Sequence, residues 1–173
     1  MTDNEVLKKL FDVIDAGLAA RGITDVVTQQ SYQPTQQGAN IENTILLHPI
    51  DSQRYGHTEV KVSGSTRTET YWLLRTYQVD ALALQDVEDT SKPTAFDLVD
   101  IAASIMQDQD TRQALLADGI GIIRIQPLRM SYIIDDRGRN ENAPSFDFTI
   151  NYRQSRTTTV PTTTTVVPGL YPV

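Results

Sequence analysis

The feature that most constrains the fold is the stretch from Thr66 to Leu84, TRTETYWLLRTYQVDALAL, which reads as one long β-strand. At about 3.3 Å per residue, residues 70–82 would span about 40 Å, roughly twice the length of an ordinary strand. Both faces are apolar at residues 71–74, so we expect a helix of the same chain to cover one face and a neighbouring subunit to cover the other. Period-two alternation places Tyr71, Leu73, Tyr77 and Val79 on one face, and Trp72 and Leu74 on the other.

Size and composition narrow the class of protein. The 173 residues suit one domain with a core of its own. A net charge of −7 argues against a protein that grips phosphate backbones, although DNA could still slide past it. The absence of cysteine excludes disulfides and thiolate sites. The charged N-terminus and the lack of an apolar run of about 20 residues predict no signal peptide and no membrane span, so we expect a soluble protein made in a cytoplasm.

Two main helices are predicted, over residues 3–21 and 94–107, because apolar residues recur there at helical spacing. Their starts carry polar caps, Thr2 with Glu5 and Thr94 with Asp97. A shorter helix is predicted over residues 111–118, capped by Asp110 and stopped by Gly119.

The other strands are predicted from alternation and turn residues. In the first half of the chain, a short strand begins at Val26, and two more lie within residues 41–50 and 57–62. Arg54, Tyr55 and Gly56 look like a hairpin loop between the last two.

In the second half of the chain, residues 120–134 and 145–152 are expected to pair as an antiparallel hairpin through a loop at 135–144. The apolar phase changes at Pro127, which predicts a bulge at residues 126–128. Together the elements predict an α+β fold: an antiparallel or mixed β-sheet of about five strands, with the two main helices on one face.

The composition changes near the C-terminus, and we divide the chain there into a domain over 1–153 and an extended arm over 154–173. The arm is rich in Thr, Val and Pro and carries no charge after Arg156. Its prolines forbid a helix and favour extended chain. Two interpretations remain open: a disordered tail, or an arm that lies on a neighbouring subunit or adds a strand to it.

Residues with catalytic or metal-binding patterns are absent from the sequence. His48 and His57 lie in no metal-binding motif, and the acidic stretches at 86–89 and 108–110 are typical of solvated loops and caps. Basic residues are dispersed, so no nucleic-acid site is predicted. We therefore predict no catalytic, cofactor-binding or metal-binding residue.

Five stretches carry a family resemblance. They are the Gln-rich loop Ser31–Gly38, the strand segment Arg75–Val79, the helix start Thr94–Leu98, the segment Gly119–Arg124 and the strand start Pro144–Phe148. On these residues the chain resembles the bacteriophage neck or tail terminator proteins, over roughly residues 3–153.

The resemblance implies a virion structural protein, assembled in the host cytoplasm, with a small α+β domain. It implies a homo-oligomeric ring, usually a hexamer, that caps the head-proximal end of the tail tube and halts tube polymerisation. The implied partners are copies of the chain itself, the tail tube protein, the head–tail connector or collar protein, a sheath protein and DNA in transit. Neither a cofactor nor a membrane is implied.

The subunit contacts of such a ring are a hypothesis from the residues. We expect them to include Tyr71, Trp72, Leu74, Gln36, Gln37, Arg137, Arg139, Val166, Leu170 and Tyr171. An acidic channel lining would keep DNA from sticking. The rival interpretations are another neck protein such as a head-to-tail connector or head completion protein, a monomeric hydrolase or metal-dependent enzyme using His48 or His57, and a binding module of a non-viral tube machine.

Overall fold

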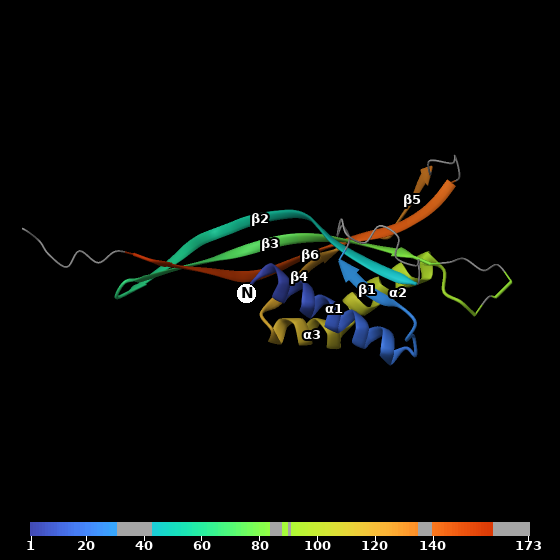
Figure 1. Cartoon of the computed structure of the whole chain (residues 1–173), viewed down its shortest axis with the longest axis horizontal. Coiled ribbons are helices and arrows are strands. Elements are labelled where there is room, and N and C mark those ends of the chain that lie inside the picture. The colour runs from blue at the N-terminus through green and yellow to red at the C-terminus, as the bar shows by residue number, and fades with distance from the viewer. Residues whose placement is uncertain (31–42, 84–87, 90, 135–139, 161–173) are drawn as a thin grey trace, which may run out of the picture.

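One strongly elongated β-sheet, with helices along part of one face, organises the protein (Figure 1). The computed structural model describes residues 1–30, 43–83, 88–89, 91–134 and 140–160. Its elements are α1 Asp3–Ala20, β1 Val27–Gln30, β2 Thr44–Ser63, β3 Thr66–Leu82, α2 Ala95–Gln107, α3 Gln109–Ala117, β4 Ile120–Ile125, β5 Arg129–Ile134 and β6 Asn140–Thr159.

The sheet is mixed. Its order is β1-β2-β3-β6-β4, and β5 pairs with the N-terminal half of β6. β1 is parallel to β2, and every other pair is antiparallel. The predicted α+β fold with helices on one face is confirmed, with six strands in the described residues instead of about five.

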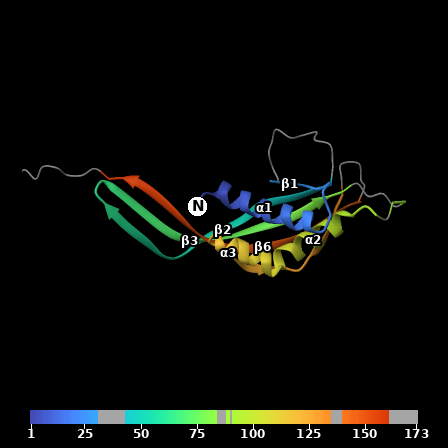
Figure 2. The ribbon, with the colours of Figure 1, turned by 90° about the horizontal axis from the view of Figure 1, so that it is seen from below.

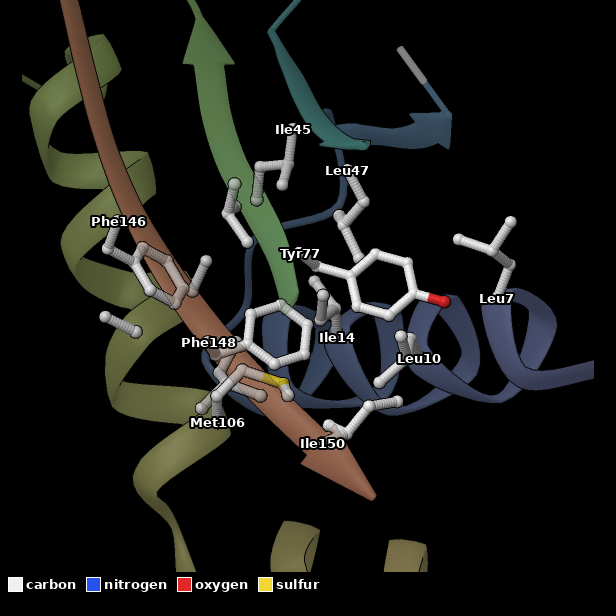
Figure 3. Packing of buried hydrophobic residues seen from close by; sticks show 14 of the residues in the cluster. Leu7, Leu10, Ile14, Ile45, Leu47, Tyr77, Met106, Phe146, Phe148 and Ile150 are labelled. Carbon is white, nitrogen blue, oxygen red and sulfur yellow. The ribbon is translucent and has the colours of Figure 1, made fainter. Parts of the chain in front are cut away.

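The core lies where the helices cover the sheet (Figure 3). β3 is a single 17-residue strand, as predicted, and its Leu73, Tyr77 and Val79 are buried. The Tyr77 ring stacks on the Phe148 ring at a centroid distance of 5.5 Å. The predicted inward face of β6 is confirmed by the burial of Phe146, Phe148, Ile150 and Tyr152. Each such side chain contributes about 1.5–3 kcal/mol by leaving water.

The two main helices begin where their caps predict. α1 has a capping box between Thr2 and Glu5, and α2 has one between Thr94 and Asp97. α3 begins two residues earlier than expected, because Asp108, and not Asp110, supplies the cap. The helices pack closely at Gly17, where an added Cβ would lie 2.6 Å from the Cγ2 of Ile105.

The prediction of a hairpin loop at residues 54–56 is wrong. β2 runs unbroken through this segment as a 20-residue strand. Its pairing with β3 instead shifts twice, between Pro49 and Asp51 and between Tyr55 and Glu59. Gly56 has φ +73°, a conformation that glycine adopts without a Cβ penalty, so the chain bulges there and continues.

The prediction of a single strand over residues 120–134 is also wrong. Residues 126–128, where a bulge was predicted, instead separate β4 from β5, and both pair with the long β6. Between the two strands, the backbone amide of Gln126 donates a hydrogen bond to the backbone carbonyl of Asp147 at 2.7 Å. β6 also continues past the predicted residue 152, so residues 154–159 of the expected arm are part of the sheet.

Candidate assembly surface

Three strands extend past the N-terminus of α1 as a projection that we call the wing (Figure 2). The wing consists of residues 53–63 of β2, 66–72 of β3 and 153–159 of β6. β2 and β3 are joined at its tip by a turn in which Gly64 has φ +57°. None of the described helices covers either face of the wing (Figures 1 and 2).

Polar contacts between strands hold the wing together. The Thr70 and Ser155 hydroxyls lie 2.9 Å apart, and those of Thr68 and Thr157 lie 3.4 Å apart. The outer edges, formed by the β2 and β6 segments of the wing, pair with no described strand. Free edges of this kind invite pairing with another chain unless charged residues protect them.

The face of the wing that points away from the helix layer is its outer face, and it carries an aromatic cluster. We define this cluster as Tyr55, Trp72, Arg153 and Glu59. The centres of the Tyr55 and Trp72 rings lie 6.3 Å apart, and the Arg153 guanidinium lies 5.6 Å from the centre of the Trp72 ring. Trp72 is 37% exposed and Tyr55 is 36% exposed. Exposed Trp, Tyr and Arg side chains are the types enriched at protein interfaces.

Polar bonds fix the aromatic cluster in place. Arg153 donates to Glu59 at 2.6 Å, and the amide of Asn151 donates to the Tyr55 hydroxyl at 3.1 Å. Hydrogen bonds from Lys61 and then from Arg153 lower the pKa of Glu59, so this carboxylate is charged at neutral pH. The cluster is therefore ordered before any partner arrives, which reduces the entropy lost on binding.

The opposite, inner face of the wing continues the face that the helices cover. Here the Arg54 guanidinium lies 4.2 Å from the centre of the Tyr71 ring, and the Tyr71 hydroxyl donates to Gln154 at 2.8 Å. Val60 and Val62 are 47% and 66% exposed. These two valines therefore form apolar surface that the subunit itself leaves exposed to solvent.

A polar cluster marks the base of the wing, where α1 begins. Arg75 pairs with Asp3 at 2.8 Å, and the Tyr152 hydroxyl donates to the same carboxylate at 3.1 Å. Burial raises the pKa of Tyr152, so this phenol stays neutral and keeps the proton that it donates to Asp3. These bonds fasten α1 to the sheet at the point where the helix layer ends.

The structure places three of the predicted contact residues where the wing joins the helix-covered sheet. Trp72, which is exposed, and the half-buried Leu74 just beyond the wing share the outer face, and Tyr71 lies half-buried on the inner face. The other predicted residues, Gln36, Gln37, Arg137, Arg139, Val166, Leu170 and Tyr171, lie outside the described residues.

Sequence reasoning missed Tyr55, Glu59 and Arg153. Tyr55 was assigned to a loop, whereas the structure places it directly opposite Trp72 in the β2–β3 pairing. The sequence did contain a signal for Tyr55. If the strands on either side of the Gly64 turn are paired residue by residue, with one bulge allowed in β2, Tyr55 comes to lie beside Trp72.

Catalytic or metal-binding geometry is not found in the described part of the chain. No group of three or more His, Cys, Asp or Glu residues there could hold a metal ion. His48 and His57 are nine residues apart on β2, about 30 Å along a strand, so they share no site. No described helix is long and apolar enough to cross a membrane.

Comparison with known proteins identifies the family. A sequence model described as E217 gateway protein gp29 matches residues 5–162, which include the helix-covered sheet and the whole wing. A search of curated proteins found no match. The matched family is a phage structural family of the head–tail junction and not a known enzyme family. The chain therefore belongs to the E217 gateway protein gp29 family, whose members are structural proteins of the phage neck.

Proposed function

We propose that this protein forms a closed ring of six identical subunits in the phage neck, with DNA passing through its centre. The observation that carries the proposal is the aromatic cluster on the wing, which the subunit orders but does not cover. A surface that contacts a different surface on the next copy closes into a ring when the rotation between copies allows it. Membership of a head–tail structural family supports the location.

The native mass of the purified protein tests ring formation. The expected species is six times the 19.3 kDa of the chain, seen as an annulus by electron microscopy. Trp72→Ala combined with Tyr55→Ala should move the protein to smaller species, because it removes the aromatic surface. Leu82→Ala is the matched control, since Leu82 is a similarly exposed residue of β3 at the opposite end from the wing. A monomeric wild-type protein at high concentration would overturn the proposal.

The ring's place in the neck has two candidates. In the first, it caps the head-proximal end of the tail tube, ends tube polymerisation and joins the tail to the connector or collar protein, with a sheath protein as a further neighbour. In the second, it is a head-to-tail connector, which the word "gateway" in the family description favours. Phage lacking the gene separate the two: a tube terminator leaves overlong tubes, whereas a connector leaves normal tails unattached to heads.

The segments outside the described residues belong to this proposal as further contacts. They are the predicted contact residues Gln36, Gln37, Arg137, Arg139, Val166, Leu170 and Tyr171. Ending the chain after Val160 keeps β6 intact and removes the last three of them. We expect weaker assembly from this truncation, and unchanged assembly and tail length would remove the segment from the proposal.

The channel lining follows from charge. A protein of net charge −7 is suited to a lumen that repels phosphate and lets DNA move without binding. A density map of the assembled ring with a lumen rich in exposed arginine would contradict this part of the proposal.

A further inference from the structure

Charge is divided unequally between two parts of the molecule. The wing, residues 53–72 with 153–159, holds five Lys or Arg and two Glu, a net +3, although the whole chain carries −7. Residues 95–118, which contain α2 and α3, hold five Asp and one Arg, a net −4. Two regions of opposite charge on one chain attract each other between copies.

The inner face of the wing has the unpaired cations. Arg54 and Arg156 are exposed, and neither forms an ion pair with any described residue. Arg67, by contrast, pairs with Glu69 at 2.7 Å on the same face. On the same face, the exposed Val62 lies opposite Arg67 and the exposed Val60 lies opposite Glu69 in the β2–β3 pairing. This face therefore needs a partner that is both acidic and partly apolar.

The outward side of α2 and α3, which we call the α2–α3 surface, has the complementary properties. Asp100 and Asp110 are exposed, and their carboxylates have no ion-pair partner in the described part of the chain. Leu116 is 65% exposed beside an open recess of about 340 Å³, whose lining mixes the polar Gln107, Gln109, Arg112 and Gln113 with the apolar Leu116 and Ile122. The surface thus offers unpaired carboxylates and exposed apolar side chains.

We propose that the inner face of the wing lies on the α2–α3 surface of the next subunit. The inference rests on the proposed ring and adds a second contact to it, made by the face of the wing opposite the aromatic cluster. The wing does not contact the α2–α3 surface of its own subunit, because its three strands extend away from α2 and α3 (Figure 2). The occupant is a second copy, because one chain carries both complementary faces. Such a contact is heterologous, so each subunit gives its wing to one neighbour and receives a wing from the other.

Two charge-reversal variants test the pairing. The wing variant carries Arg54→Glu and Arg156→Glu, and the helix variant carries Asp100→Lys and Asp110→Lys. Because like charges then face each other, each variant alone should need at least about tenfold more protein to assemble. A chain with all four substitutions should regain assembly, because its reversed wing meets a reversed α2–α3 surface.

Mixing the two assembly-deficient variants gives the sharpest result. The normal wing of the helix variant fits the normal α2–α3 surface of the wing variant, and the reversed wing of the wing variant fits the reversed α2–α3 surface of the helix variant. We therefore expect a 1:1 mixture to regain assembly, as rings in which the two variants alternate, at concentrations where neither variant assembles alone. Asp12→Lys in α1 is the control, because it changes the same charge on a helix outside the proposed contact.

The outcomes separate this inference from the proposed ring. Circular dichroism of every variant should match the wild-type protein, because all four residues are exposed. Rings formed by the helix variant at wild-type concentrations would overturn the inference and leave the ring standing. A 1:1 mixture of the two variants that fails to assemble would overturn it too. A wild-type protein that never assembles would instead overturn the proposed function, and this contact with it.

Discussion

The helix-covered half of the sheet and the wing are built from the same three strands, yet different forces hold them. In the covered half, alternate residues of β3 and β6 are buried apolar side chains under α1 and α2. In the wing, the positions that continue this face are mostly polar or charged, and the side-chain contacts between strands are hydroxyl pairs and the Arg153–Glu59 ion pair. The comparison shows where the subunit buries its own apolar side chains and where it leaves its side chains uncovered.

The largest expected effect breaks the covered half. Phe148→Ala should lower the free energy of unfolding by about 3–5 kcal/mol, because it empties a fully buried aromatic site against Tyr77. Trp72→Ala in the wing should change the monomer by less than about 1 kcal/mol, since a half-exposed ring leaves no cavity. Urea denaturation at a concentration where both variants are monomeric measures the difference. Equal losses would mean that the wing has a core of its own.

The next effect concerns the helix layer alone. Gly17→Ala should cost about 1–3 kcal/mol, because the new Cβ would lie 2.6 Å from Ile105 and force the helices apart. Combining it with Ile105→Ala should cost less than the sum of the two single changes, because alanine lacks all three side-chain atoms that the new Cβ would meet. Thermal unfolding of the two single variants and the double variant tests this, and strictly additive losses would place the strain elsewhere.

A smaller effect links the helix layer to pH. Thr94→Ala should cost about 1 kcal/mol, because it removes the cap of α2. Hydrogen bonds from Thr94 lower the pKa of Asp97, so this carboxylate stabilises the fold above the unfolded pKa of about 3.9. That contribution is lost as pH falls through the lower, folded pKa.

Asp97→Asn therefore gives the control for the pH effect. It should be less stable than the wild-type protein at pH 7 and should lose less on acidification to pH 3. Denaturation at both pH values measures this, and an identical acid response in both proteins would show that Asp97 does not carry it.

The smallest effect sharpens the description of the wing. Thr70→Val should cost no more than about 0.5 kcal/mol, because it removes one exposed hydroxyl pair with Ser155. Hydrogen exchange should nevertheless register it, as faster exchange of the wing amides with no change near Tyr77. Exchange that speeds up equally in both halves would mean that the sheet opens as one unit.

Local signals in the sequence predicted much of the covered half. α1, α2, β3 and the inward face of β6 follow from capping residues and apolar spacing, which act within a few residues of each other. The third strand of the wing was not predicted, because the alternation in β6 becomes polar after Tyr152 while the strand continues on β3. Pairing with a long neighbour, a non-local cause, overrides weak local preference there.

The candidate site was predicted only in part, for the same reason. Trp72 stood out as an apolar residue on the second face of a long strand. Its neighbours Tyr55 and Arg153 come from segments 17 and 81 residues away in sequence, and only the sheet register joins them. Gly56 also imitates a turn locally, although β3 keeps that segment extended.

The irregular pairing of β2 has a geometric consequence. β2 has 20 residues where β3 has 17, and both shifts in register lie before or within the wing. A strand longer than the partner it follows must arch, so the surplus residues fix the direction in which the projection leaves the body. In any closed assembly gripped by that projection, this angle determines how many copies complete the circle, and hence its bore. Three surplus residues in one strand would then decide the diameter of the passage.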